Sequence, residues 1–468
     1  MIDAIPIEHT GARSVSGPLL IVQAVSGVGW DEDAIITLDT GERRHGVVLD
    51  VSDDLAVIQV FEGTSGISLD RVRVAFSGTP MRVPVGPQWL GRVCNGRGEP
   101  IDGGPPIRGD RLVAVNGVPI NPAARQLPQD PIVTGISAID GLTTLVRGQK
   151  LPIFSVGGLP HLELAAQIAA QARVADGAFQ IVFAAMGVTH ADADATRDAL
   201  EERSESGDLA LFINTASDPV VERVLTPRLA LTVAEHLAFE RGGHVLVLMC
   251  DMTSYAEAVR EVSAARGEVP GRQGYPGYLF SDLASLYERC GRLQVSPGSL
   301  TQIPVLTMPS GDITHPVPDL TGYITEGQVV LSEEMQSRNV YPPFEALSSL
   351  SRLMRHGVGL HRTRPDHMAV AGQVYAALSH ARQVRELTDL VGETGLAEND
   401  RAYLRFGDAL ETDLLNQGRT EARSIEDSLE RAWAALTLLP SGDLSRLDPD
   451  DLARHLTAIR DEPTGEHP

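Results

Sequence analysis

The chain has 468 residues and a formal net charge of −23 at pH 7. Several domains are expected at this length, because a single hydrophobic core rarely grows beyond about 250–300 residues. The acidic balance disfavours binding to nucleic acid or directly to an anionic membrane surface, because like charges repel. Other proteins are therefore the expected partners.

No stretch approaches the roughly 18 consecutive apolar residues of a membrane span, and the start of the chain lacks a basic region followed by an apolar run. These features predict a cytoplasmic protein that does not cross a bilayer. Cys94, Cys250 and Cys290 are widely spaced and odd in number, so we interpret them as buried packing residues rather than disulfide or metal-binding residues. Lys150 is the sole lysine in the chain.

The elements at the start of the chain are short apolar or alternating runs. They lie at 19–22, 34–38, 47–51 and 55–61, and turn residues separate them. This pattern predicts an N-terminal β-barrel over residues 1–75. Glycine and proline become frequent from Gly86 to Asp140, which is typical of a connecting strand-and-loop segment.

The central part of the chain alternates apolar runs of strand length with longer amphipathic stretches. The expected strands lie at 151–156, 179–186, 209–214 and 244–250, and the expected helices lie at 161–175, 192–203, 227–241 and 252–266. Such an order predicts βαβ units, and therefore a parallel sheet with helices on both faces. We assign residues 76–350 to this central α/β nucleotide-fold domain.

Helical periodicity dominates the last part of the chain. The expected helices lie at 366–391, 398–416 and 425–439, with a link around Gly392–Gly395 between the first two. Asp448 and Pro449 are placed as the N-cap and first turn of a last short helix. Residues 351–468 are therefore expected to form a C-terminal helical domain.

Residues 151–165 have the strand, glycine-bearing turn and helix layout of a phosphate loop, but the signature of that loop is altered. In the G-x-x-x-x-G-K-[ST] spacing, Ser155 and Pro160 replace the glycines, His161 replaces the lysine and Leu162 replaces the hydroxyl residue. Proline removes a backbone donor, and leucine cannot bind a cation. Tight binding of MgATP is not expected here, and an unrelated strand-to-helix turn fits this segment alone equally well.

Two further positions bear on the same chemistry. Asp251 ends the apolar strand 244–250, where P-loop ATPases place a carboxylate beside Mg²⁺, although aspartates at this position often act as helix N-caps. Val188 stands where a carboxylate would be needed to orient the attacking water, and its side chain has no such group. A self-sufficient homohexameric ATPase motor is therefore disfavoured, but it is kept as the alternative.

With these features in place, the chain resembles the non-catalytic B subunit, also called the beta chain, of V-type and archaeal-type rotary ATPases. Several phrases along the chain carry the resemblance: 60–66, 134–142, 158–161, 251–253, 269–278, 313–316 and 350–354. The Gly158-Leu159-Pro160-His161 replacement of the phosphate loop is the mark of the non-catalytic subunit in this family. Relatives often carry Gly-Ser-Gly before Leu-Pro-His and Asn after it, where this chain has Val156-Gly157-Gly158 and Leu162.

The resemblance implies a hexamer in which three such chains alternate with three catalytic A subunits around a central rotor. It implies further contacts with central-stalk and peripheral-stalk subunits. The membrane is reached only indirectly, through the complex, on its cytoplasmic face. Proton transport coupled to ATP synthesis or hydrolysis is the implied activity of the complex, although the sequence determines neither the ion nor the direction.

The resemblance also implies roles for single residues. Arg352 takes the position of the arginine that reaches the ATP phosphates held by the neighbouring catalytic subunit. Arg272 is a weaker candidate for that interface, and Tyr341 for the wall of an adenine pocket; simple packing is the alternative for both. MgATP is then held mainly by the partner, with no tightly bound cofactor and no metal in this chain. Weak binding of ATP or ADP at Gly157–His161 and Asp251 stays open, as does a purely structural adaptor without an active Arg352.

Overall fold

The computed structural model describes residues 7–23, 25–52, 54–392 and 396–461. The chain divides into two compact units, each built from two separate segments. The first unit comprises residues 1–121 and 180–289, and the second comprises residues 122–179 and 290–468. Within the described ranges, none of the helices combines the length and apolar composition that a membrane crossing requires.

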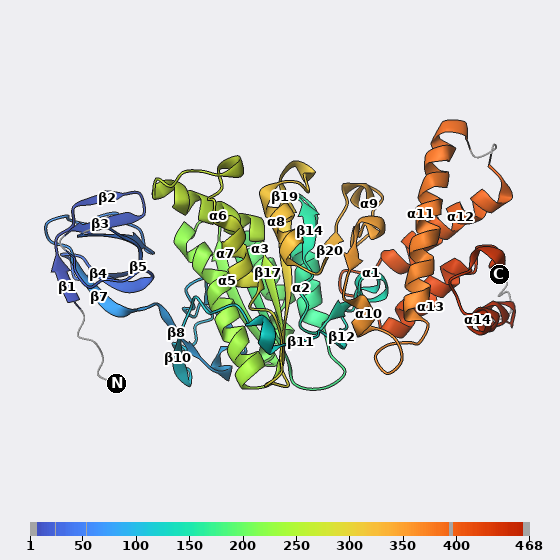
Figure 1. Ribbon diagram of the computed structural model, residues 1–468, viewed down its shortest axis with the longest axis horizontal. Helices are drawn as coiled ribbons and strands as arrows, with labels where there is room; N and C mark the ends of the chain where they lie inside the picture. Colours follow the sequence, from blue (N-terminus) through green and yellow to red (C-terminus); the bar gives the residue numbers. More distant parts are fainter. Residues whose placement is uncertain (1–6, 24, 53, 393–395, 462–468) are drawn as a thin grey trace. The chain divides into compact units, whose positions relative to one another are not determined.

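The first unit begins with an antiparallel β-barrel, drawn in blue in Figure 1. Its strands are β1 (Ile7–Thr10), β2 (Ser14–Ser16), β3 (Leu19–Gln23), β4 (Glu32–Thr37), β5 (Arg43–Ser52), β6 (Leu55–Val60) and β7 (Arg73–Pro80). They pair in the order β1-β7-β4-β5-β6-β3-β2. Along β4, buried and partly exposed side chains alternate, as expected for a strand with one face on a core. Leu20, Ile36 and Phe76 belong to that core, and the predicted barrel is confirmed.

The rest of the first unit is an α/β layer in which parallel strands pair in the order β17-β15-β16-β9. Its elements are β8 (Arg82–Val85), β9 (Arg92–Asn95), β10 (Arg111–Ala114), β15 (Phe179–Val188), α3 (His190–Ala199), α4 (Glu201–Glu205), β16 (Leu209–Thr215), α5 (Val220–Glu235), β17 (His244–Cys250), α6 (Met252–Ala265) and α7 (Leu279–Tyr287). All seven residues of β17 are buried, which is typical of a strand covered on both faces. The βαβ pattern predicted from the sequence is therefore present.

Two helices of this layer differ from their predicted ranges. The helix expected at 192–203 is divided at Leu200, whose backbone leaves the helical conformation and whose side chain is buried. The helix expected at 227–241 begins seven residues earlier, at Val220, so that Pro227 lies inside it. A proline is expected in the first turn of a helix, where a missing N–H costs nothing. Burial of the apolar side chains before it, such as Leu225, favours the longer helix.

The second unit holds the remaining strands, which pair in the order β21-β20-β14-β19. Its strands are β11 (Arg125–Gln126), β12 (Pro131–Ile132), β13 (Leu145–Val146), β14 (Ile153–Val156), β18 (Gly291–Leu293), β19 (Ser299–Met308), β20 (Gly327–Val330) and β21 (Leu350–Ser351). Its shorter helices are α1 (Ser137–Leu142), α2 (His161–Gln171), α8 (Pro316–Ile324), α9 (Glu333–Ser337) and α10 (Met354–Gly357). Strand β14 lies parallel to both β19 and β20, with the altered phosphate loop at its carboxyl end.

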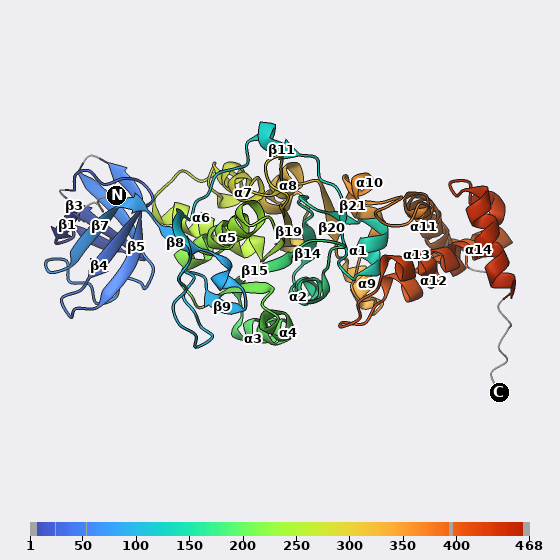
Figure 2. The same cartoon turned by 90° about the horizontal axis from the view of Figure 1, so that it is seen from below.

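The second unit ends in a helical domain, which Figure 2 shows in orange and red. It contains α11 (His367–Val391), α12 (Glu398–Ala409), α13 (Ile425–Leu436) and α14 (Pro449–Asp461). The expected helix 398–416 is α12 only to Ala409, and a π-helical turn, Leu410–Leu415, continues it. The predicted link at Gly392–Gly395 lies mostly outside the described residues. Asp448 lies directly before α14, and its carboxylate accepts the Asp450 N–H at 2.9 Å, as predicted for an N-cap.

Candidate functional site

The altered phosphate loop joins β14 to α2, and His161 is the first residue of that helix. Gly157 and Gly158 are exposed, whereas Leu159 is buried. Gly158 has a φ of +91°, a backbone conformation that favours glycine. The segment therefore has the strand, turn and helix layout that the sequence predicts.

Hydrogen bonds inside this loop use backbone donors that a phosphate would need. Leu159 N–H donates to Val156 O at 3.2 Å, and His161 N–H donates to Leu159 O at 2.8 Å. Pro160, between them, has no N–H. The His161 ring is also turned into the loop, with Nδ1 2.9 Å from Leu159 O. The Leu159–His161 segment is therefore closed on itself and offers a poor cradle for an anion.

Lys150 lies before β14 and is held by Glu326. Its Nζ atom lies 3.0 Å from Glu326 Oε1, and its backbone N–H donates to Glu326 Oε2 at 2.8 Å. Lys150 is 3% exposed, so moving its ammonium group to the loop would break its ion pair with the partly exposed Glu326. The ammonium group and the backbone N–H of Lys150 are therefore both bound to the Glu326 carboxylate.

Arg352 follows β21, and its side chain is exposed. Its backbone N–H donates to Glu326 O at 2.9 Å, and its Nη1 donates to Thr325 O at 3.1 Å. The two strands meet closely here, since a Cβ atom at Gly327 would lie 2.3 Å from Leu350 O. The turn that carries Arg352 is therefore fixed by backbone contacts, while its side chain is exposed.

Tyr341 is buried beside α2. Its hydroxyl donates to Gln167 Oε1 at 2.8 Å, and the Arg419 Cζ atom lies 4.5 Å from the centre of its ring. Arg419 forms an ion pair with Glu163 of the first turn of α2. Burial raises the pKa of the Tyr341 phenol, and the Glu163 carboxylate raises it further, so the hydroxyl stays protonated.

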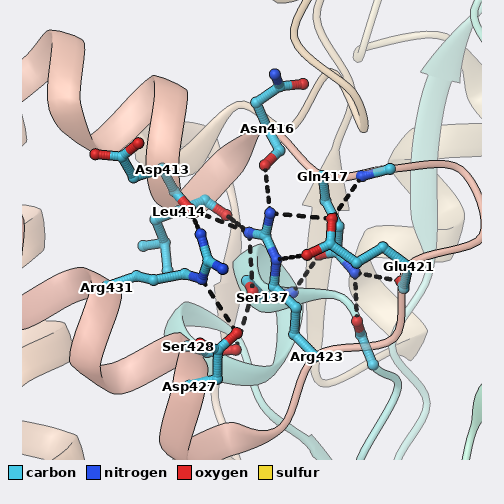
Figure 3. A network of polar contacts seen from close by, with 12 residues as sticks. Ser137, Asp413, Leu414, Asn416, Gln417, Glu421, Arg423, Asp427, Ser428 and Arg431 are labelled. Carbon is cyan, nitrogen blue, oxygen red and sulfur yellow. Dashed lines mark hydrogen bonds and ion pairs between the residues drawn. The ribbon is translucent and has the colours of Figure 1, made fainter. Parts of the chain in front are cut away.

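Arg423 holds the loop that carries Arg419, and Figure 3 shows its contacts. Its guanidinium donates to three carbonyl oxygens at the end of the π-helical turn, those of Asp413, Leu414 and Asn416. It also donates from Nε to Glu421 Oε1 at 2.6 Å, and this hydrogen bond lowers the pKa of Glu421. Arg423 is buried, so these bonds give the segment from Asn416 to Arg423 a defined conformation.

Gln417 connects the same loop to helix α1 (Figure 3). Its Nε2 donates to Gly135 O at 2.6 Å, and its Oε1 accepts the Ser137 N–H at 3.0 Å. On the other side, Gln167 Nε2 of α2 donates to Gly418 O at 3.0 Å. The loop from Asn416 to Arg423 is therefore fastened both to α1 and to the helix that follows the altered phosphate loop.

The remaining predicted site residues lie in the first unit. Asp251 caps α6, where its carboxylate accepts the Thr253 N–H at 2.7 Å. Val188 ends β15 and is buried, and Arg272 is exposed in a short 3₁₀ turn. In the part of the chain that the structure describes, no group of three or more His, Cys, Asp or Glu side chains is placed to hold a metal ion.

Sequence reasoning did not single out Glu163, Gln167, Arg419 or Arg423. One signal was present, because Glu163 and Gln167 are four residues apart and so share a face of α2. Their partners, however, lie more than 170 residues away along the chain. Nothing in the local pattern around Arg419 indicates that it meets Tyr341.

Three sequence profiles match the chain in succession. The β-barrel domain of the ATP synthase alpha/beta family matches residues 13–78, and its nucleotide-binding domain matches residues 135–351. The C-terminal domain of V and A type ATP synthase matches residues 356–456. The order agrees with the barrel, the nucleotide fold and the helical domain described above.

Individual relatives match over nearly the whole length. The B subunit of the A-type ATP synthase of Aeropyrum pernix is 53% identical over 450 residues, which are 96% of this chain and 97% of that protein. The solved structure of the ATP synthase subunit NeqB from Nanoarcheaum equitans is 38% identical, with a TM-score of 0.72, and the match covers 90% of this chain and all of that one. The chain therefore belongs to the family of B subunits of V- and A-type ATP synthases.

Proposed function

We propose that this chain is the non-catalytic subunit of a rotary ATPase, and that it contributes to ATP chemistry at a neighbour's site. In this proposal three copies alternate with three catalytic A subunits in a ring around the central rotor. The complex couples ATP synthesis or hydrolysis to ion transport. Membership of the B-subunit family supports this reading.

The observation that carries the non-catalytic role is the closed, altered phosphate loop. The Leu159 and His161 N–H groups are used within the loop, and Pro160 has none to offer. Leu162 has no oxygen for Mg²⁺, and Lys150 is committed to Glu326. The residues present do not fit MgATP, and no step of hydrolysis is assigned to this loop. ATP or ADP is expected to bind here weakly if at all.

The catalytic contribution is assigned to Arg352, acting in trans. A guanidinium stabilises the negative charge that develops on a transferring phosphoryl group, and it is always protonated. Arg352 suits this task because its turn is fixed through Thr325 and Glu326 while its side chain stays exposed for a neighbour. MgATP is then held mainly by the A subunit.

The other assignments follow from the same arrangement. Arg272 is proposed as an interface residue because it is exposed on a glycine-rich segment. Contacts with central-stalk and peripheral-stalk subunits, and a place on the cytoplasmic face of the membrane, complete the proposal. Binding to nucleic acid is not part of it, since the net charge of −23 repels a phosphate backbone.

Reconstitution with the catalytic subunit tests this function. The chain alone should show no ATPase activity, whereas the mixture should hydrolyse ATP. The Arg352→Ala variant should assemble normally but lower turnover by a factor on the order of 10³–10⁵, the range for such arginines. Arg355→Ala, a nearby exposed arginine on α10, is the matched control and should keep near-normal turnover.

Two results contradict the proposal. Robust ATP hydrolysis by the chain alone would support the self-sufficient homohexameric motor instead. Near-normal turnover of the assembled Arg352→Ala ring would leave the chain as a structural adaptor. Size-exclusion chromatography of each mixture separates loss of assembly from loss of chemistry.

A further inference from the structure

A cavity of about 230 Å³ lies inside the first unit, between the outer face of the β-barrel and helices α5 and α6. Because side chains alternate along a strand, Val48 and Ile58 belong to the barrel core, whereas Val47 and Gln59 line the cavity. The opposite wall consists of apolar side chains from α5 and α6: Val221, Val224, Leu225, Val259 and Val262. One water molecule needs only roughly 10–15 Å³ of such space, so the cavity is large enough for a small organic molecule.

Gln59 places an amide group in this largely apolar cavity. The residue is 2% exposed, and its side chain forms no hydrogen bond with any residue that the structure describes. Its neighbours on the adjacent strands are Leu19 and Val47, whose apolar side chains offer no partner. Buried amides are nearly always hydrogen-bonded, because leaving one without a partner costs free energy. The Gln59 amide therefore has unused donors and an unused acceptor that a ligand could meet.

The charged side chains around the cavity already have partners. Arg228 forms an ion pair with Asp282, and Arg266 Nη1 lies 3.4 Å from Glu268 Oε1. Asp31, at the mouth of the cavity, is exposed and stays in contact with water. An ion that entered would lose its hydration without meeting an unpaired counter-charge inside. The lining therefore favours an uncharged ligand.

We propose that this cavity is a binding site for an uncharged amphipathic molecule, with an apolar chain and an amide or hydroxyl head group. The chain would lie against the valine side chains of α5 and α6, where its burial is favourable. The head group would form hydrogen bonds with the Gln59 amide. This site belongs to the first unit, whereas the altered loop and Arg352 belong to the second, so it does not depend on the proposed function.

Three probes with the same chain and different head groups test the chemistry of the site. Octanamide is uncharged, octanoate carries a negative charge and octylamine carries a positive charge. Their binding to the purified full-length chain is measured by ligand-observed NMR titration. Octanamide should bind saturably, and each ion should bind at least roughly tenfold more weakly, because its charge must leave water.

Two substitutions in the lining test the location. Gln59→Leu should weaken octanamide binding by roughly tenfold, because the hydrogen bonds are lost while the apolar contacts remain. Val224→Phe should abolish binding, because the half-buried Val224 lines the cavity and a larger ring there fills the space. The matched controls are Gln88→Leu and Val118→Phe, at exposed positions of the same unit outside the cavity lining, and both should bind octanamide as the wild type does.

Three results would overturn the site. Lack of saturable octanamide binding by the wild-type chain would leave the cavity as a space for water. Equal affinity of the wild type, Gln59→Leu and Val224→Phe would place the bound probe elsewhere. Octanoate or octylamine binding as tightly as octanamide would contradict an uncharged ligand. If Val224→Phe does not fold, Gln59→Leu and the three head groups still decide the matter.

Discussion

Lys150 and Glu326 show how a charge is accommodated inside the second unit. Removing an ammonium group from water costs several kcal/mol, and a partner must offset that cost. Glu326 does so with one oxygen on Nζ and the other on the Lys150 backbone N–H. Because the Glu326 carbonyl also accepts the Arg352 N–H, the same pair supports the turn that presents Arg352.

Neutralising one member of this pair should therefore destabilise the protein more than neutralising both. Glu326→Gln should lower the free energy of unfolding by about 1–3 kcal/mol, because the buried Lys150 ammonium group loses the charge of the carboxylate that lies 3.0 Å away. The double change Lys150→Met with Glu326→Gln should cost less than Glu326→Gln alone. Urea unfolding measures both, with exposed Glu333→Gln on α9 as the control.

If the single and double variants were equally unstable, the buried lysine would not be the cause. If the proposed function holds, the ATPase rate of the chain reconstituted with the catalytic subunit gives a second readout. A displaced Arg352 turn should lower turnover in Glu326→Gln without preventing assembly.

For single residues, the sequence was most informative where the chemistry of the side chain alone rules out a role. Proline has no N–H and leucine has no metal-binding oxygen, so Pro160 and Leu162 could be interpreted without a structure. Arg352 could be selected from many arginines only through the family resemblance. Arg419 was missed because its partners, Glu163 and Tyr341, are distant in the sequence.

Asp251, at the start of helix α6, has a position in the sequence that suggests a role in binding Mg²⁺, but in the structure its side chain caps the helix. Asp251 stands at the end of β17, where a carboxylate for Mg²⁺ is expected in this fold class. Its carboxylate accepts the Thr253 N–H at 2.7 Å, which satisfies one of the free donors at the start of the helix. Capping therefore accounts for its position, and a role in nucleotide binding stays a prediction.

Substitutions that keep or remove the cap should separate these roles. Asp251→Ala should lower the free energy of unfolding by about 1 kcal/mol, whereas Asp251→Asn should change it by only a few tenths, because asparagine also caps helices. Urea unfolding followed by circular dichroism measures the difference. An asparagine variant as unstable as the alanine variant would show that the negative charge, and not the cap, is required.

Strands with a long apolar run were predicted well, whereas helices that contain a proline or continue into a π-helical turn were not. Strands β16 and β17 each contain five or more consecutive apolar residues, and they lie close to their predicted ranges. The predicted start of α5 was wrong. Prolines are normally found in the first turn of a helix, but here burial of the residues before Pro227 outweighs that preference. The π-helical turn after α12 has the same apolar spacing as a longer helix, so periodicity alone does not distinguish them.

At the scale of the whole chain, the sequence predicts three consecutive domains, whereas contacts group the residues into two interleaved units. The strands of the nucleotide fold are divided between these units, and strand order depends on pairing that no local pattern records. The fastening of α1 to the loop from Asn416 to Arg423 is likewise a contact between distant segments. The patterns along the chain predict the fold class, but they do not predict how the residues are grouped into two units.

The burial of a sole lysine gives this protein a built-in reporter of unfolding. The peptide bond after Lys150 lies between residues that are 3% and 2% exposed, and the adjacent Leu151 N–H is hydrogen-bonded to Gln302 O at 3.0 Å. A protease specific for lysine should therefore leave the folded chain intact and cut the unfolded chain into residues 1–150 and 151–468. Gel electrophoresis across a urea series measures this, with Lys150→Arg as the uncut control.

Rapid cleavage of the native chain would contradict the buried position of Lys150. If the bond is protected, the rate of cutting follows the population of opened molecules. Assembly with partner subunits should then slow proteolysis in proportion to the stability that it adds. The rate of cleavage at this single bond therefore measures how often the molecule opens.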